Sequence, residues 1–150
     1  MSAQAVWPRP SAIALGAILD PVKRVLKTKP FSRWCALSDE TLCAAAREIE
    51  CGEYEADLGK GVVKKRVAYP GRGKSGSARL LVAQRMKRFI IFLVGRDKSD
   101  AGTDFTREQE NAAKELALAY EKLDAAELQR AIAGGALKEI CDDDQETTKP

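Results

Sequence analysis

The pattern of apolar and polar residues predicts one helix followed by three strands in the middle of the chain. Leu42, Ala46 and Ile49 recur at helical spacing. Ser38, a residue type that caps helix N-termini, precedes them, and Gly52 is expected to end the helix. The stretches GVVKKRVAY, ARLLVAQ and RFIIFLVG are rich in β-branched and aromatic residues and are separated by turn residues. They predict a meander of three antiparallel strands.

Helical spacing returns after the meander. Thr106 is expected to cap a helix, with Gln109 closing a capping box. The apolar stripe of this helix should pack on the sheet and consists of Ala112, Ala113, Leu116, Tyr120 and Leu123. Asp124 should cap a last helix that stops at Gly134, before a short strand in ALKEI. This order predicts one compact α+β domain, a small antiparallel sheet flanked by N-terminal and C-terminal helices.

The two ends of the chain are expected to lie outside this domain, which we place at residues 25–141. Residues 1–24 contain three prolines and the apolar run SAIALGAIL, which is far shorter than the roughly 20 residues that span a bilayer. We interpret them as an extension of the domain. Residues 142–150, DDDQETTKP, are interpreted as an acidic, disordered tail. No membrane partner is expected.

Positive charge is concentrated in the middle third of the sequence. The formal net charge is only +3, yet twelve Lys or Arg residues stand between Lys60 and Lys98 with a single acid, Asp97. Cations that gather in one segment indicate a polyanionic partner such as nucleic acid.

The four cysteines do not suggest a metal site. They form no C-x-x-C pair, and the chain contains no histidine that would complete a typical zinc set. We expect them to be small buried residues of a cytoplasmic protein that uses no metal and no other cofactor.

A glycine-rich loop resembles the end of a nucleotide-binding loop. Gly73, Lys74 and Ser75 match the last positions of G-x-x-x-x-G-K-[ST], but Ala68 stands where the first glycine belongs. A phosphate-binding loop of this kind needs a following helix whose N-terminus meets the anion, whereas a strand is predicted here. We therefore interpret the loop as a cationic turn between two strands.

Strand alternation predicts a cationic face beside this loop. Lys64 and Arg66 should share one face, and Arg79 should join them if the strands pair. The other face is mainly apolar, so Lys65 should lie along it and extend its ammonium outward. Arg72 and Lys74 would reach over the cationic face from the loop.

RNA is a polyanion that such a face could cleave. Attack by the RNA's own 2′-hydroxyl needs a base, a positive clamp on the phosphate and an acid for the leaving oxygen. Arginine clamps phosphate, and lysine exchanges protons when neighbouring cations favour the neutral amine. We expect Lys64 to transfer protons and Arg66 and Arg79 to stabilise the phosphate. Lys74 and Lys98 are alternative proton carriers, and nucleic-acid binding without cleavage remains an alternative function.

The block ADLGKGVVKKRVAYPGRGKSGSAR resembles the RelE-type toxins of bacterial type II toxin-antitoxin systems, nearest the HigB-like branch. The stretches VLKTKPFSRW, FLVGRDKSD and REQENAAKELALAY extend this resemblance from about residue 25 to residue 140. It implies a metal-independent endoribonuclease that cleaves messenger RNA, usually on the ribosome. It also implies a cognate antitoxin as a partner, often a helix-turn-helix repressor.

The resemblance assigns the catalytic set to Lys64, Arg66, Arg79 and Lys98. A second set is expected to contact RNA and comprises Lys65, Arg72, Lys74, Arg96 and Phe105. Phe105 is the aromatic residue nearest to the position where some family members carry a tyrosine, and it has no hydroxyl to exchange a proton. Two alternatives stay open: a ParE-like toxin that binds a protein such as DNA gyrase, and a degenerate RNA-binding module.

Overall fold

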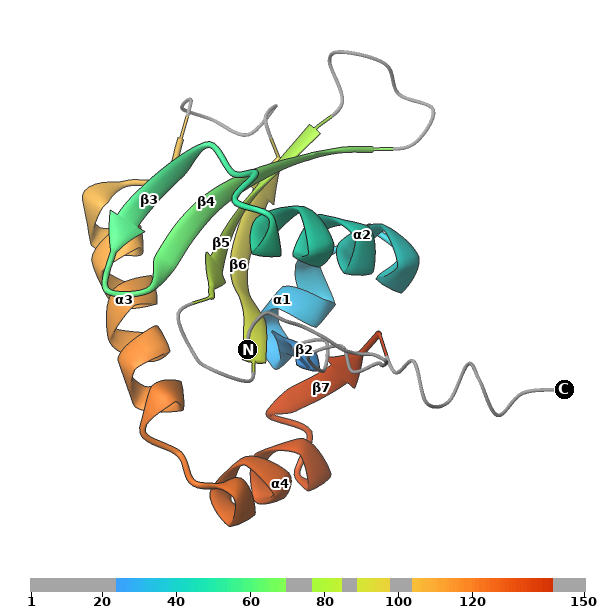
Figure 1. Cartoon of the computed structure of the whole chain (residues 1–150), viewed down its shortest axis with the longest axis vertical. Helices are drawn as coiled ribbons and strands as arrows, with labels where there is room; N and C mark the ends of the chain where they lie inside the picture. Colours follow the sequence, from blue (N-terminus) through green and yellow to red (C-terminus); the bar gives the residue numbers. More distant parts are fainter. Residues whose placement is uncertain (1–23, 70–76, 85–88, 98–103, 142–150) are drawn as a thin grey trace, which may run out of the picture.

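The computed structural model describes residues 24–69, 77–84, 89–97 and 104–141. These residues form a six-stranded sheet flanked by helices (Figure 1). The strand order is β3-β4-β5-β6-β2-β7. The strands are β2 (Arg24–Thr28), β3 (Ala56–Gly59), β4 (Val62–Ala68), β5 (Ser77–Ala83), β6 (Phe89–Asp97) and β7 (Leu137–Ile140). The helices are α1 (Lys29–Trp34), α2 (Asp39–Glu50), α3 (Arg107–Glu121) and α4 (Ala125–Ala133).

The predicted meander is confirmed, because β4, β5 and β6 pair antiparallel in sequence order. Strand β5 begins at Ser77, directly after the glycine-rich loop, as the interpretation of that loop requires. The loop itself, residues 70–76, lies outside the described residues. Strands β2 and β3, the first two along the chain, were not predicted. Strand β2 pairs parallel to β6 and antiparallel to β7, and β3 adds an edge to β4.

The sheet separates two hydrophobic cores. Helices α1 and α2 cover one face, where Phe31 and Leu42 pack with Val63 and Phe92. Helices α3 and α4 cover the other, where Ala113 and other residues pack with Leu81 and Ile91. Figure 1 shows α2 and α3 on opposite sides of the sheet. The central strands are therefore buried on both faces, and this explains the continuous apolar run of β6.

The helix caps agree with the sequence, and the stripe of α3 agrees in part. Ser38 accepts from the backbone of Thr41, and Thr106 forms its capping box with Gln109. Ala113, Tyr120 and Leu123 pack into the core as predicted. Ala112 is exposed and Leu116 is 36% exposed, and Ala117 is buried in their place. Two small residues one turn apart let the helix backbone lie close to the sheet, and the larger Leu116 remains outside.

The expectation for the cysteines is wrong. Cys43 and Cys141 form a disulfide, with their Cα atoms 5.6 Å apart. Cys51 is exposed and Cys35 is half-buried. Cys43 lies in α2, and Cys141 directly follows β7, the edge strand beside β2. The bond therefore joins α2 to this edge of the sheet. The two residues are 98 positions apart, so no local spacing could reveal the pair. Among the described helices, none is long and apolar enough to cross a bilayer.

Candidate functional site

Three arginines stand side by side on neighbouring strands. Arg66 of β4 lies directly opposite Arg79 of β5, and Arg79 lies directly opposite Arg96 of β6. Strands are spaced by about 4.8 Å, so this arginine row is about 10 Å across. Arg66 is exposed, and the other two side chains are half-buried. The predicted pairing of Arg66 with Arg79 on one face is therefore present.

A β-bulge brings the third arginine to this face. Leu81 pairs with Val94 but the next residue, Val82, pairs with Phe92, so Leu93 is an extra residue in β6. Leu93 and Val94 therefore lie on the same face. If β6 instead paired regularly from Phe92 onward, Gly95 would lie opposite Arg79 and Arg96 would point to the opposite face. The strand alternation in the sequence could not show this change.

Lys64 lies on the same face as the arginine row, one alternation before Arg66. Its ammonium is 2.5 Å from Oδ2 of Asp104 and 3.5 Å from Oε2 of Glu110. Cationic neighbours were expected to surround this amine. The structure instead places two carboxylates against it, and both come from the segment that begins α3. The Lys64 side chain, which is only 16% exposed, is therefore held in one position by its ion pair with Asp104.

Asp104 connects the two ends of the site. Its carboxylate binds Lys64, while its backbone carbonyl accepts a hydrogen bond of 2.6 Å from Nη1 of Arg96. Partial burial alone would raise the pKa of Asp104, but hydrogen bonds from Lys64 and from the Phe105 N–H, together with the positive charges of Lys64 and Arg79, lower it below its usual range. Asp104 therefore stays ionised over the whole neutral range.

Sequence reasoning missed both Asp104 and Glu110. Acids near the start of a helix ordinarily stabilise the positive end of the helix dipole, so neither residue stood out. Their contact with Lys64 joins residues 40 and more positions apart in the chain. Only the packing of α3 against β4 and β5 brings them there.

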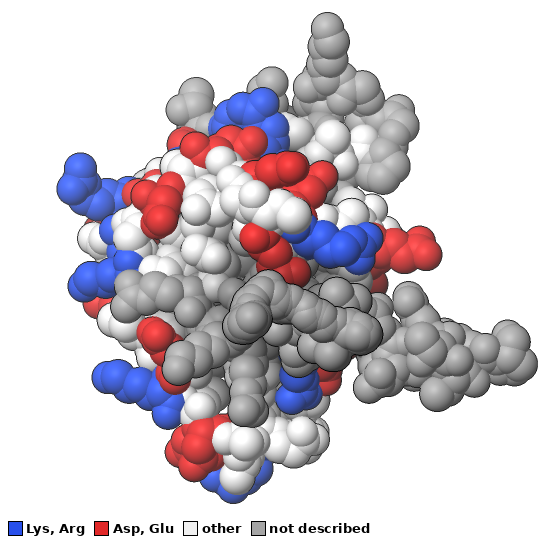
Figure 2. Space-filling view, viewed as in Figure 1, with Lys and Arg blue, Asp and Glu red and all other residues white. Residues whose placement is uncertain are grey.

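The surroundings of the basic segment are more acidic than the segment itself. The backbone N–H of Arg66 donates to Oε1 of Glu55 at 2.6 Å. On the face shown in Figure 2, Asp and Glu side chains lie among the Lys and Arg side chains of the described residues. The count of a single acid between Lys60 and Lys98 is correct. The fold, however, adds acids from segments on either side of it.

The other residues expected in the site lie elsewhere. Lys65 lies on the face covered by α2 and is 6% exposed, with its ammonium 2.8 Å from Oε1 of Glu48 and 2.9 Å from the carbonyl of Glu53. Its outward reach along an apolar face was predicted, but it does not adjoin the arginine row. Phe105 is 8% exposed and packs in the core beneath α3, so its ring face is not presented to a base. Arg72, Lys74 and Lys98 lie outside the described residues.

The meander flanked by helices, with basic residues on one face of the sheet, agrees with the RelE-like α+β fold expected from the sequence. The family model described as RelE toxin of RelE / RelB toxin-antitoxin system matches residues 23–140. The chain therefore belongs to the RelE toxin family and is the toxin of a toxin-antitoxin system, whose partner is an antitoxin. No curated protein matches the sequence.

Proposed function

We propose that this toxin cleaves messenger RNA and that the arginine row with Lys64 is its active site. The observation that carries the proposal is the alignment of Arg66, Arg79 and Arg96 on three adjacent strands. Like charges that face each other across strands destabilise a sheet. Asp104 offsets part of this repulsion, and an anionic partner would offset more of it. Guanidinium groups bind phosphate through paired hydrogen bonds, so an RNA backbone suits this role.

The proposed reaction uses no metal. The 2′-oxygen attacks the adjacent phosphorus while its proton passes to a base, a role we assign to Lys98 of the catalytic set that the resemblance implies, and the bond from phosphorus to the 5′-oxygen breaks. The products are a 2′,3′-cyclic phosphate and a 5′-hydroxyl, whose proton comes from an acid. The arginine row would stabilise the charge on the phosphate oxygens. Lys64 is about 7 Å along the strand from Arg66, close enough for its ammonium to reach the leaving oxygen.

Asp104 suits a positioning role better than proton transfer. A carboxylate whose pKa is lowered accepts protons poorly, because catalysis is most efficient when the pKa lies near the working pH. Its ion pair with Lys64 and its carbonyl contact with Arg96 would instead hold the proton donor and the clamp in register. We assign Lys64 as the acid, the arginines as the clamp and Asp104 as the residue that positions both.

We further propose the setting in which the enzyme acts. The substrate is messenger RNA on the ribosome, in the cytoplasm, and a cognate antitoxin covers the arginine row until it is removed. The sequence resemblance supports this setting. An acidic segment of the antitoxin would bind the same cations as the phosphates do.

A second candidate function is RNA binding without cleavage. The specific observation in its favour is that Lys64 is bound by two carboxylates in the free protein, so its charge is largely neutralised before any RNA arrives. A ParE-like toxin that binds DNA gyrase would also need no cleavage chemistry. Both alternatives predict growth arrest or RNA binding with intact transcripts.

The test is to induce the toxin without its antitoxin and to map the 5′ ends of messenger RNA. Wild type should produce new 5′ ends within coding regions, and the double variant Lys64→Ala/Arg79→Ala should not. Lys122→Ala, which removes an exposed cation at the end of α3, is the matched control and should cleave as wild type does. Growth arrest by wild type with intact transcripts would exclude the nuclease.

A further inference from the structure

The extra residue of β6 has a backbone carbonyl that is bound from the neighbouring strand. Leu93 is the extra residue at the bulge, and it is 0% exposed, so water cannot reach it. Its carbonyl accepts a hydrogen bond of 2.9 Å from Oγ1 of Thr28, the last residue of β2. A bulge interrupts the regular ladder, and a buried carbonyl that has no partner destabilises the fold. The Thr28 hydroxyl therefore stabilises β6 in its bulged form.

The same hydroxyl also caps helix α1. Its oxygen accepts a hydrogen bond of 3.2 Å from the backbone N–H of Phe31. A hydroxyl group has one proton to donate and two lone pairs to accept, so it can make both bonds at once. Thr28 is 2% exposed, and both bonds are buried. Thr28 thus joins α1 to β6 at the position of the bulge.

Helix α1 contacts β6 on both sides of the bulge. The ring of Phe31 stacks on the ring of Phe92, with their centroids 5.5 Å apart. The indole of Trp34 lies against Gly95, where an added Cβ atom would come within 3 Å of three ring carbons. Phe92 precedes Leu93 and Gly95 follows it. The helix therefore covers β6 over the length of the bulge.

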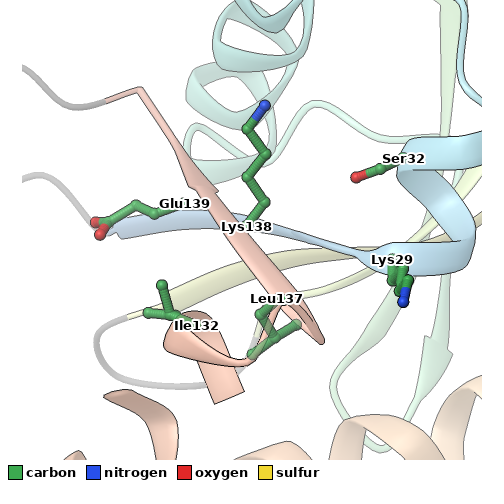
Figure 3. Close-up of a pocket in the computed structure, with 7 residues that line it drawn as sticks. Lys29, Ser32, Ile132, Leu137, Lys138 and Glu139 are labelled. Atoms are coloured by element: carbon green, nitrogen blue, oxygen red, sulfur yellow. The ribbon is translucent and has the colours of Figure 1, made fainter. Parts of the chain in front are cut away.

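The side of α1 that faces β7 is packed less completely. A cavity of about 440 Å³ lies there, and Lys29 and Ser32 of α1 and Lys138 of β7 are among the residues that line it (Figure 3). Packing on this side therefore contributes less to the placement of α1 than packing against β6.

Trp34 and Thr28 favour the bulged pairing of β6 over a regular one. In a regular pairing Gly95 would turn to the face of the arginine row, and Val94 and Arg96 would turn to the face of Trp34. Their side chains would meet an indole that lies closer to the strand than a Cβ atom allows. Trp34 thus disfavours the regular pairing, while the Thr28 hydroxyl stabilises the bulged one.

We propose that Thr28 is a positioning residue of the arginine row: its hydroxyl keeps β6 bulged at Leu93 and thereby holds Arg96 beside Arg79. Thr28 is too buried to touch RNA, so it acts through the strand. Because the row is the proposed phosphate clamp, the effect of Thr28 on RNA binding rests on the proposed function. Its effect on the pairing of β6 does not.

The pairing is tested by NMR of the full chain without RNA. Arg79 and Arg96 lie directly opposite each other, so their backbone protons should give a cross-strand NOE. Thr28→Val, which keeps the shape of the side chain but has no hydroxyl, should weaken this NOE to less than about half of its intensity, because the Leu93 carbonyl is left without its partner. Thr28→Ser, which retains the hydroxyl, should retain the NOE. An NOE of wild-type intensity in Thr28→Val would overturn the proposal.

Ser38→Ala is the matched control for the loss of a helix cap. Ser38 caps α2 as Thr28 caps α1, and it accepts from the N–H of Thr41 at 3.1 Å. This variant should leave the NOE between the arginines unchanged. If Ser38→Ala weakened the NOE as much as Thr28→Val does, loss of a cap would explain the effect and the proposal would be wrong.

A measurement on wild type applies even if Thr28→Val does not fold. The hydroxyl proton of Thr28 should exchange with water at least about tenfold more slowly than that of Ser38, which is exposed. Equal exchange rates would show that the bond to Leu93 does not hold the bulge.

RNA binding tests whether Thr28 acts through Arg96. A 2′-O-methyl RNA oligomer is the probe, because it lacks the attacking hydroxyl and stays intact. Thr28→Val should lower its affinity by about three- to tenfold, and Thr28→Ser should not. Thr28→Val should cause no further loss in an Arg96→Gln background but its full loss in an Arg66→Gln background. Equal losses in the two backgrounds would indicate a general effect on the fold and would contradict the proposal.

Arg96→Gln alone separates this proposal from the proposed function. If this variant bound the oligomer as tightly as wild type, Arg96 would not contact RNA and the proposed clamp would fail. The NOE between Arg79 and Arg96 would still decide whether Thr28 sets the pairing of β6.

Discussion

Lys64 and Asp104 are bound to each other across 40 residues of sequence, with Nζ and Oδ2 2.5 Å apart. The contact ties the strand that carries Arg66 to the segment that begins α3. It makes Asp104 the first residue to test, because its carboxylate contacts Lys64 and its backbone carbonyl contacts Arg96.

Asp104→Asn should lower the rate of RNA cleavage without weakening RNA binding. The substitution keeps the backbone carbonyl for Arg96 but loses the ion pair that positions Lys64, so we expect a fall in kcat of about ten- to a hundredfold. RNA affinity should stay the same or rise, because one negative charge leaves the site. Single-turnover cleavage, and binding of RNA that carries a 2′-deoxy group at the cleaved position, measure the two effects.

Glu110→Gln is the matched control for this prediction. It removes the same charge, but its oxygen is 3.5 Å from Lys64 instead of 2.5 Å. Its effect on kcat should therefore be smaller than that of Asp104→Asn. Equal losses in the two variants, or a parallel loss of RNA affinity, would show that charge and not position matters.

The lowered pKa of Asp104 predicts a specific acid sensitivity. Because the folded protein favours the ionised form, this group contributes stability above its unfolded pKa of about 3.9, and the contribution is lost as the pH falls through the folded value. Wild type should thus be more stable than Asp104→Asn near pH 7, and the difference should shrink below about pH 4. Urea unfolding of both proteins between neutral pH and pH 3 measures this. A constant difference across that range would contradict the prediction.

Arg79→Gln should weaken RNA binding but not the fold. Arg79 has an arginine on each side in the sheet, so its removal relieves repulsion, but it also removes an attraction to the Asp104 carboxylate; we expect stability to change by no more than about 1 kcal/mol. RNA affinity should fall about tenfold or more, and the salt dependence of binding should decrease by about one phosphate contact.

Lys65→Gln, on the same hairpin, should have the opposite effect: it should weaken the fold but not RNA binding. Its ammonium is bound by Glu48 and by the carbonyl of Glu53, away from the arginine row. It should cost about 1–2 kcal/mol of stability and leave the salt dependence of RNA binding unchanged. A large loss of RNA affinity in Lys65→Gln would return this residue to the binding site.

The disulfide should contribute measurably to stability. Its loop closes 98 residues, and cross-links of long loops typically stabilise proteins by about 2–4 kcal/mol. Cys43→Ser should lower the free energy of unfolding by that amount under oxidising conditions and have little effect under reducing ones. Cys51→Ser, at an exposed free cysteine, is the control and should change neither. Equal stability of Cys43→Ser and Cys51→Ser under oxidising conditions would show that the disulfide does not form in solution.

Gly95 should not tolerate a larger residue. A Cβ atom added there would lie within 3 Å of three carbon atoms of the Trp34 ring, whose indole is too rigid to yield. Gly95→Ala is expected to destabilise the protein by about 1–3 kcal/mol. Trp34→Leu in the same chain should recover part of this loss, and thermal melting of the single and double variants measures the coupling.

The sequence pattern within a few residues was enough to predict three parts of the fold. The helix after Ser38, the meander and the capping box at Thr106 all rest on propensity and periodicity within a few residues. Strand β2 is only five residues long and leads directly into a helix that contains Pro30, so its sequence has no strand signal that stands apart. It is stabilised by pairing with β6 and β7, which are distant in sequence.

The candidate site also contains residues that local pattern predicted and residues that only the tertiary packing brings together. Lys64, Arg66 and Arg79 were predicted from alternation along β4 and from the pairing of two strands across a short loop. Asp104 and Glu110 were missed because their role comes from the packing of α3 on the sheet. Phe105 was assigned to RNA contact from the family resemblance, yet the same packing buries it.

The bulge at Leu93 makes the pairing of β6 as important as its composition. If β6 paired regularly with β5 through Leu93, Gly95 would lie opposite Arg79, and Arg96 would turn to the face on which Trp34 lies. Every amino acid needed for the row would still be present in the sequence. Homologues of this toxin should therefore be compared by whether β6 carries the extra residue before its final arginine, since an arginine at the end of a regular strand of the same length would not join the row.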